Sequence, residues 1–318
     1  MTAGRSFDLE ADGVRVHAVE WSTMLAPSTE RVERRVLLVH GLGANTLSWE
    51  PIAQPLADRL GATVTAIDLV GFGRTRAPER TATIDTNRRL VTAVLEQLGP
   101  SIVAGNSMGG AIGIGLTARR PDLVEGLVLV NPAVPHPSPS VGDWLRIARL
   151  APVMVTPIGR RVVGSRARLL GPERLVDTSL GYSLHDPTRL DPDLRRRLIA
   201  LAAERYAFPE APAAYVDAAR SLFLYLARGI NADLVTASGS RPTLLLHGAL
   251  DRLVPLAAAH GAAARSAAID LEVLDGIGHA PQLEDPARVV DVVTAWCDAR
   301  MRGWQGSSST PSAASSPS

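Results

Sequence analysis

Short, almost uninterrupted apolar segments constrain the fold of this chain more than any other feature. Segments of this length, rich in Val, Leu and Ile, are typical of strands buried on both faces of a sheet. Amphipathic stretches such as SWEPIAQPLADRL, TNRRLVTAVLEQLG and AAAHGAAARSA lie between several of them, and this alternation predicts an α/β fold with a mostly parallel central sheet flanked by helices. The apolar segments are RVLLVHG, ATVTAIDLVG, SIVAGNS, LVEGLVLVNP, RPTLLLHG and IDLEVLDG.

Two regions depart from this alternation. The N-terminal stretch SFDLEADGVRVHAVEW alternates apolar and polar residues on either side of Asp12-Gly13, which predicts a hairpin with a tight turn. Residues 132–238 are rich in proline and arginine and contain helical patterns but no convincing strand. We therefore predict a core formed by residues 1–131 and 239–302, a helical cap at 132–238 inserted into it, and a disordered Ser-rich tail at 303–318.

Composition excludes several classes of protein. The formal net charge of the 318 residues is +1 and charged residues make up 20%, so no bulk electrostatic attraction favours nucleic acid. The single Cys297 offers no internal disulfide, and no apolar stretch reaches the length of about 18 residues that a membrane span requires. We expect a cytoplasmic protein without stable membrane insertion, whose partner is a small molecule bound in a site.

No cofactor or metal is predicted. The segment VGFGRTR follows a strand and contains Gly71 and Gly73, but Arg76 stands where a dinucleotide-binding fingerprint has its third glycine. No Walker A sequence occurs, and no His, Cys or carboxylate residues have the spacing of metal ligands.

The segment IVAGNSMGGAIGIG places one serine, Ser107, on a glycine-rich turn between a predicted strand and a predicted helix. Gly105, Ser107 and Gly109 fit the pattern G-x-S-x-G, with Asn106 directly before the serine. In this pattern the serine occupies strained backbone, and its neighbours two positions away lack side chains that would clash. The pattern favours a nucleophile over an ordinary glycine turn.

A serine nucleophile needs a base and an orienting carboxylate. His279 follows the last apolar segment and precedes the final helix, where its ring can reach the sheet edge. Asp251 follows a buried strand, and the order Ser107, Asp251, His279 is the one expected of this sheet type. Asp275 and Asp285 are alternatives for the acid, and a surface ion pair is the competing interpretation for all three aspartates.

Acyl transfer also needs N–H donors for the developing oxyanion. The first expected donor is the backbone N–H of Met108, directly after the serine. The second is the N–H of Leu42 in VHGLGAN, a turn shaped by His40, Gly41 and Gly43. An ordinary strand-to-helix turn would explain this segment equally well.

Together these motifs resemble the α/β-hydrolase superfamily over about residues 5–300. The resemblance is carried by HGLG, DLVGFGRT, GNSMGG, HGALDRLVP and GIGHAPQLEDP. It implies that Ser107, Asp251 and His279 form a catalytic triad and that residues 132–238 form the cap. A serine at position 107 departs from the dehalogenase and epoxide-hydrolase branches, which place aspartate there.

Ester hydrolysis through an acyl-enzyme is the activity that we rank first, on a substrate with an apolar acyl part. GNSMGG is also similar to the C–C hydrolases of ring-fission dienones, but those have a tryptophan where this chain has Ala280, and a longer glycine turn. Cofactor-free haloperoxidase or perhydrolase chemistry uses the same triad, and a binding protein on a hydrolase fold is the non-catalytic alternative.

The cap sequence allows two interpretations of its arginines and of its apolar segments. The arginines either form a solvated surface or bind an acidic substrate, and solvated helix faces are the commoner case. The segments LAPVMVTPIG and LFLYLARG either line an acyl pocket or pack the cap on the core. The arginines are Arg160, Arg161, Arg166, Arg168 and Arg195 to Arg197.

Overall fold

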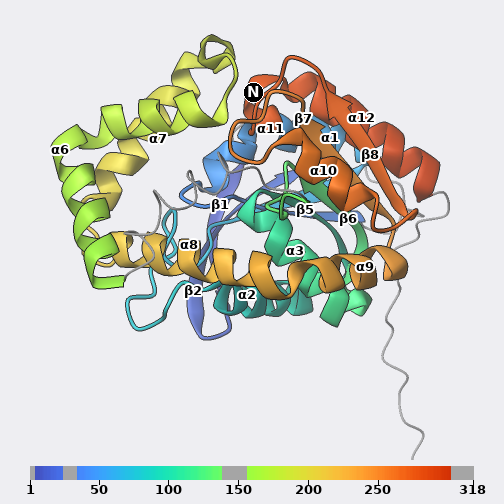
Figure 1. Ribbon diagram of the computed structural model, residues 1–318, viewed down its shortest axis with the longest axis horizontal. Helices are drawn as coiled ribbons and strands as arrows, with labels where there is room; N and C mark the ends of the chain where they lie inside the picture. The colour runs from blue at the N-terminus through green and yellow to red at the C-terminus, as the bar shows by residue number, and fades with distance from the viewer. Residues whose placement is uncertain (1–3, 24–33, 138–155, 302–318) are drawn as a thin grey trace, which may run out of the picture.

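A computed structural model describes residues 4–23, 34–137 and 156–301 of the chain. Within these ranges eight strands form one sheet, with helices packed on both of its faces (Figure 1). The strand order is β1-β2-β4-β3-β5-β6-β7-β8, and every pairing from β4 to β8 is parallel. The strands are β1 (Arg5–Ala11), β2 (Val14–Ser22), β3 (Arg34–Val39), β4 (Ala62–Ile67), β5 (Ser101–Asn106), β6 (Val124–Val130), β7 (Thr243–Gly248) and β8 (Ile269–Leu274).

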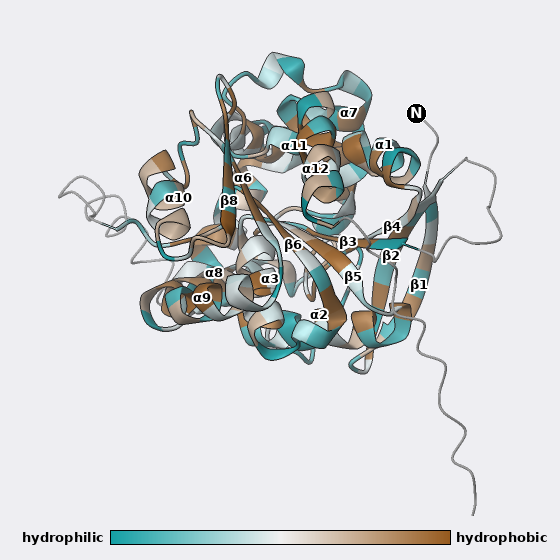
Figure 2. Ribbon diagram, turned by 90° about the vertical axis from the view of Figure 1, so that its right-hand side faces the viewer, coloured by the Kyte–Doolittle hydropathy of each residue, from teal (hydrophilic) through white to brown (hydrophobic). Residues whose placement is uncertain are grey.

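The central strands are buried on both faces, as their apolar sequences predict. Every residue of β5 and of β7 is buried. Successive side chains of a strand point to opposite faces. Leu37 accordingly packs into a cluster with Ile112 and Leu234, while its neighbour Leu38 packs on the other face with Ile52 and Val293. The apolar strands therefore lie between two helical layers (Figure 2).

The predicted N-terminal hairpin is confirmed. β1 and β2 pair antiparallel with Ala11 opposite Val14, and the two turn residues Asp12 and Gly13 have φ values of 50° and 67°. Asp-Gly is the dipeptide expected where both turn residues need positive φ. β2 in turn pairs antiparallel with β4, so the hairpin extends the parallel sheet at one edge.

Helices connect the strands and cover the sheet. On one face lie α2, α3, α9 and α10, and on the other lie α1 and α12. The helices are η1 (Thr46–Trp49), α1 (Glu50–Leu60), α2 (Ile84–Leu98), α3 (Met108–Arg119), η2 (Pro121–Leu123), α6 (Thr156–Ser183), η3 (Pro187–Arg189), α7 (Pro192–Arg205), α8 (Ala211–Arg228), α9 (Ile230–Ser240), α10 (Leu256–Ala263), α11 (Pro281–Glu284) and α12 (Pro286–Arg300). No helix in the described ranges is both long enough and apolar enough to span a bilayer.

After β6, residues 131–137 are irregular, and residues 156–240 form helices joined by short turns, with no strand among these described residues. α6 changes direction at Gly171, whose φ is 72°, directly before Pro172. The end of α6 and the start of α7 form a small apolar cluster with residues next to His279, while α9 packs against α3. The cluster comprises Leu180, Leu184, Leu190, Leu194, Ala280 and Leu283. The division into core and cap stays a prediction, and residues 138–155 and the tail lie outside the described ranges.

Candidate active site

Ser107 lies on the turn between β5 and α3 in strained backbone. Its φ of 53° and ψ of −113° are unusual for a residue with a side chain. Its N–H donates to the Val130 carbonyl at 3.0 Å, and its own carbonyl accepts from Ala111 and Ala133. Ser107 is partly exposed between buried neighbours on both sides. The turn thus leaves Ser107 partly exposed between a buried strand and a buried helix.

Close backbone approaches explain the glycines on either side of Ser107. A Cβ on Gly105 would lie 2.4 Å from the carbonyl carbon and oxygen of Gly109. A Cβ on Gly109 would lie 2.1 Å from the carbonyl oxygen of Val39. Since these contacts are to backbone, no side-chain rearrangement would relieve them. The strand, the turn and the first turn of α3 can pack this closely only with glycine at both positions.

The turn at residues 40–43 lies against the serine turn. A Cβ on Gly41 would be 3.2 Å from Ser107 Cβ. His40 is fully buried, and its Nε2 accepts the N–H of Leu69 at 3.0 Å, so its Nδ1 carries the proton and donates to the Gly41 carbonyl at 2.7 Å. Burial lowers the pKa of His40 and keeps the ring neutral. His40 therefore fixes the shape of this turn.

The backbone N–H groups of Met108 and Leu42 are the oxyanion donors that the sequence predicts. Met108 is the first residue of α3, so its N–H has no carbonyl acceptor within the helix. Leu42 follows Gly41, and its half-buried side chain packs against the large apolar cluster on one face of the sheet. Gly43 has a φ of 76°, a conformation that favours glycine.

His279 and Asp251 form a hydrogen-bonded pair. His279 Nδ1 lies 2.7 Å from Asp251 Oδ2, and both residues are at least nine-tenths buried. The other carboxylate oxygen, Oδ1, accepts the N–H groups of Leu253 and Val254 at 2.7 and 2.9 Å. Asn106 Nδ2, directly before Ser107, donates to the His279 carbonyl at 3.2 Å. This hydrogen bond attaches the loop that carries His279, residues 275–280 and here called the histidine loop, to the turn that carries Ser107.

The carboxyl group of Asp251 is held in its charged form. Burial acts to raise the pKa of Asp251, but the hydrogen bond and charge of His279, together with the hydrogen bond from Asn131, hold it below its usual value. The two alternative aspartates lie elsewhere. Asp275 is exposed, and Asp285 caps α12 by accepting the N–H of Arg288.

Asn131 is a site residue that the sequence analysis did not identify. It is fully buried directly after β6, with a φ of 44°. Its Nδ2 donates to Asp251 Oδ2 at 2.7 Å and to the Gly278 carbonyl at 3.3 Å, while its Oδ1 accepts the N–H of Gly248 at 3.2 Å. The side-chain amide of Asn131 therefore connects the end of β6 to the end of β7, to Asp251 and to the histidine loop. The local sequence signal is an asparagine directly after a buried strand, and this signal does not reveal its partners Asp251, Gly248 and Gly278.

Glu284 is the second residue that sequence reasoning missed. Its buried carboxylate accepts the N–H of Gly278 at 2.9 Å, directly before His279. It also accepts the N–H groups of His185 and Asp186, which follow α6, at 3.0 and 2.9 Å. The N–H of His279 donates to the carbonyl of Ser183, the last residue of α6, at 2.7 Å. The histidine loop is thus anchored to the end of α6.

Most of the arginines singled out between β6 and β7 pair with acids at the surface. Arg160 lies 3.0 Å from Asp217, and Arg195 lies 2.7 Å from Asp177 and 2.9 Å from Glu173. Arg196 pairs with Asp193, and Arg197 pairs with Glu50 at the start of α1. These contacts agree with the interpretation of a solvated surface.

The structure tests the interpretation of only one of the two apolar segments that the sequence analysis singled out. Residues 150–155 of LAPVMVTPIG lie outside the described ranges. In LFLYLARG, Leu222, Tyr225 and Leu226 pack against the apolar cluster on one face of the sheet, whereas Leu224 is exposed. Packing on the core therefore accounts for much of this second segment.

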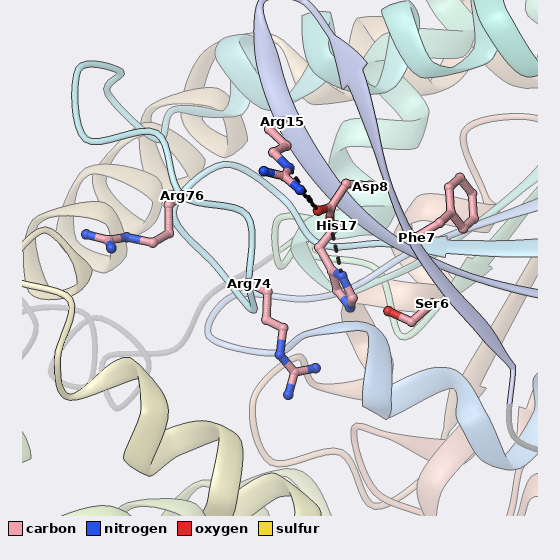
Figure 3. A pocket seen from close by; sticks show the side chains of 7 residues that line it. All are labelled: Ser6, Phe7, Asp8, Arg15, His17, Arg74 and Arg76. Atoms are coloured by element: carbon pink, nitrogen blue, oxygen red, sulfur yellow. Dashed lines mark hydrogen bonds and ion pairs between the residues drawn. The ribbon is translucent and has the colours of Figure 1, made fainter.

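A cavity of about 640 Å³ lies elsewhere, beside the N-terminal hairpin (Figure 3). Asp8 contacts both Arg15, at 2.7 Å, and His17 Nδ1, at 3.6 Å. Arg74 and Arg76 are paired with Glu204 and Glu210. The lining residues are Ser6, Phe7, Asp8, Arg15, His17, Arg74 and Arg76. None of them belongs to the site around Ser107, and their positive charges are already balanced by acids.

This sheet order, with a serine on the turn between β5 and α3, is typical of hydrolases of the α/β fold. The chain belongs to that family, because the sequence profile of the alpha/beta hydrolase fold matches residues 34–286.

Relatives and solved structures agree with this assignment. The chain is 29% identical over 273 residues to an uncharacterised protein of Mycobacterium bovis, covering 83% of this chain and 75% of that protein. It is 32% identical over 176 residues to lipase LipV of Mycobacterium tuberculosis, covering 54% and 60%. The structure of a thermophilic esterase from Thermogutta terrifontis is similar with a TM-score of 0.68 at 22% identity, covering 93% of this chain and 98% of that one, and this likeness shows the fold.

Proposed function

We propose that the protein hydrolyses carboxylic esters through an acyl-enzyme on Ser107, with His279 as general base and Asp251 orienting the imidazole. The observation that carries the proposal is the 2.7 Å hydrogen bond between His279 Nδ1 and Asp251 Oδ2, in a loop tied through Asn106 to the strained turn of Ser107. Because Asp251 accepts the Nδ1 proton, the Nε2 lone pair of the imidazole is left to take a proton from the serine.

The reaction proceeds in two acyl transfers. Ser107 Oγ attacks the ester carbonyl carbon while its proton passes to His279 Nε2, and the alcohol leaves with that proton. Water then attacks the acyl-enzyme, again giving its proton to His279, and the acid departs. The N–H groups of Met108 and Leu42 stabilise the oxyanion in both steps, since backbone donors held by α3 and by the His40 turn need no reorganisation.

A substrate with an apolar acyl part fits the proposal best. The named relative LipV is a lipase, and helices between β6 and β7 contact the histidine loop through apolar side chains. We expect nitrophenyl esters to be cleaved, with kcat/KM rising from acetate to butyrate. Each buried methylene contributes up to about 0.8 kcal/mol, so two could raise kcat/KM roughly tenfold. A steady-state panel of acetate, butyrate and hexanoate esters measures this.

The nucleophile is tested with Ser107→Ala and a fluorophosphonate probe. We expect the wild-type protein to be labelled and the folded variant to show neither labelling nor esterase activity; undiminished labelling of the variant would contradict the assignment of Ser107. Absent esterase activity with rapid bleaching of a dienone acid would instead indicate C–C bond hydrolysis. Peroxide-dependent halogenation would indicate haloperoxidase chemistry, and an unlabelled wild-type protein would indicate a binding role.

A further inference from the structure

The first half of α6, residues 156–170, carries apolar side chains on its solvent-exposed face. Leu169 exposes 83% of its surface, Ile158 51% and Val162 45%. At about 100° per residue these three positions fall within about 40° of one another around the helix. On this face the exposed polar residue Ser165 lies between Val162 and Leu169. A surface helix ordinarily carries polar side chains on such a face, and exposed apolar side chains grouped there mark interaction sites.

The opposite face of this half-helix is occupied by the protein itself. Gly159 and Gly164 are buried, and a Cβ on Gly164 would lie 3.5 Å from Pro212 of α8. Arg160 reaches Asp217 of α8, and the Tyr206 hydroxyl donates to the Ala167 carbonyl. The apolar stripe therefore faces away from the body of the molecule, and Figure 1 places α6 at its outer edge.

Positive charge borders the stripe on both sides. By the same helical spacing, Arg161 and Arg168 lie on one side of it and Arg166 on the other. All three are exposed, and none has an ion-pair partner within the described ranges. The half-helix contains no Asp or Glu. The arginines of α7 differ from these, because Arg195, Arg196 and Arg197 all pair with acids.

We propose that these six residues form a docking surface for an anionic phospholipid bilayer; we call Ile158, Val162, Leu169, Arg161, Arg166 and Arg168 the α6 docking face. Apolar side chains of an interfacial helix enter the boundary between headgroups and acyl chains, while flanking arginines extend to the phosphates. A lipid surface would contact both the apolar side chains and the arginines of this face. An acidic protein partner would account for the arginines but not for three exposed apolar side chains on the same face of the helix. This inference does not depend on the proposed esterase activity.

Vesicle sedimentation tests the proposal without involving catalysis. The full chain is mixed with vesicles of ether-linked phosphatidylcholine, with and without ether-linked phosphatidylglycerol, so that no acyl ester is present to be cleaved. We expect sedimentation with the anionic vesicles and a loss of binding at high salt. Each arginine near an anionic surface strengthens partitioning about fivefold, so Arg161→Gln/Arg166→Gln/Arg168→Gln should weaken it by about one hundredfold. Leu169→Ser should weaken it by about tenfold.

Two matched variants control for charge and for exposed apolar area. Arg195→Gln/Arg196→Gln/Arg197→Gln removes the same net charge from α7, and Leu224→Ser/Val235→Ser removes apolar side chains that are 44% and 45% exposed on α8 and α9. Both should bind vesicles like the wild type, and circular dichroism checks that every variant is folded.

Three results would overturn the proposal. One is equal binding to neutral and anionic vesicles, or no binding to either kind. Another is equal loss of binding in the α6 and α7 arginine variants. The third is a wild-type dimer that Leu169→Ser converts to a monomer, because the face would then bind a second copy of this chain.

Discussion

Asp251 Oδ2 accepts two hydrogen bonds of 2.7 Å in a buried environment, one from His279 Nδ1 and one from Asn131 Nδ2. A buried carboxylate is costly unless its lone pairs are used, and here Oδ1 also accepts two backbone N–H groups. The donors hold the charge on Asp251 and fix the carboxylate plane. In the proposed mechanism this charge stabilises the imidazolium that forms on His279.

Asp251→Asn should lower kcat/KM strongly but less than His279→Ala does. The amide keeps the geometry partly but carries no charge to stabilise the imidazolium, whereas alanine at position 279 removes the base. We expect losses of about a thousandfold or more for both variants, measured with a nitrophenyl ester. Asp275→Asn, on an exposed residue, is the control and should retain full activity. An active Asp251→Asn beside an inactive Asp275→Asn would show that the acid is misassigned.

Glu284 connects three elements through one buried carboxylate: α11, the histidine loop and the segment after α6. Glu284→Ala would leave three N–H groups without an acceptor, each costing about 1–3 kcal/mol. We expect the free energy of unfolding to fall by several kcal/mol in urea titrations and kcat/KM to fall because the His279 loop loses its anchor. Glu284→Gln, which keeps a carbonyl oxygen, should recover part of both.

Glu272→Ala provides the matched control, since Glu272 is exposed on β8. Its free energy of unfolding should stay within about 0.5 kcal/mol of the wild type. Equal effects of the two alanine variants would contradict an anchoring role for Glu284.

The serine turn depends on how closely β5 approaches α3. Gly105→Ala places a methyl group 2.4 Å from the backbone of Gly109, so either the strand or the helix must move. We expect a loss of several kcal/mol in unfolding free energy, or no folded protein, measured by denaturant titration. Gly239→Ala in α9 meets nothing within 4 Å and should instead stabilise by about 0.5–1 kcal/mol. Similar effects of the two substitutions would contradict this packing argument.

The sheet could be predicted from the sequence because each central strand is a continuous apolar segment and the turn of the N-terminal hairpin is Asp-Gly. The position of Asp251 after a buried strand, together with the chain order, favoured it as the partner of His279, and the structure pairs the two residues. Asn131 and Glu284 could not be predicted in the same way, because their roles arise from contacts with Asp251 and His185, 120 and 99 positions away. Asparagine after a strand and glutamate in a short helix are common locally, so their partners exist only in the folded chain.

Stability of the whole molecule should fall in mild acid because His40 and His247 are both fully buried. Burial lowers the pKa of each below the ordinary value of 6.5. The unfolded chain therefore binds protons more readily than the folded one, so their contribution is complete above about pH 6.5 and is lost as the pH falls below it. The lowered pKa of Asp251 affects the free energy of unfolding only at more acidic pH, below the ordinary value of 3.8.

We expect the free energy of unfolding, from urea titrations between about pH 8 and pH 5, to decline below pH 6.5 by at most about 1.4 kcal/mol per pH unit for each of these histidines. His247→Gln removes one titrating group and should make the decline shallower, whatever it does to stability at pH 8. His260→Gln, on the exposed surface of α10, is the control and should leave the slope unchanged. If His247→Gln keeps the wild-type slope while His260→Gln reduces it, the proton uptake belongs to the surface and not to the buried rings.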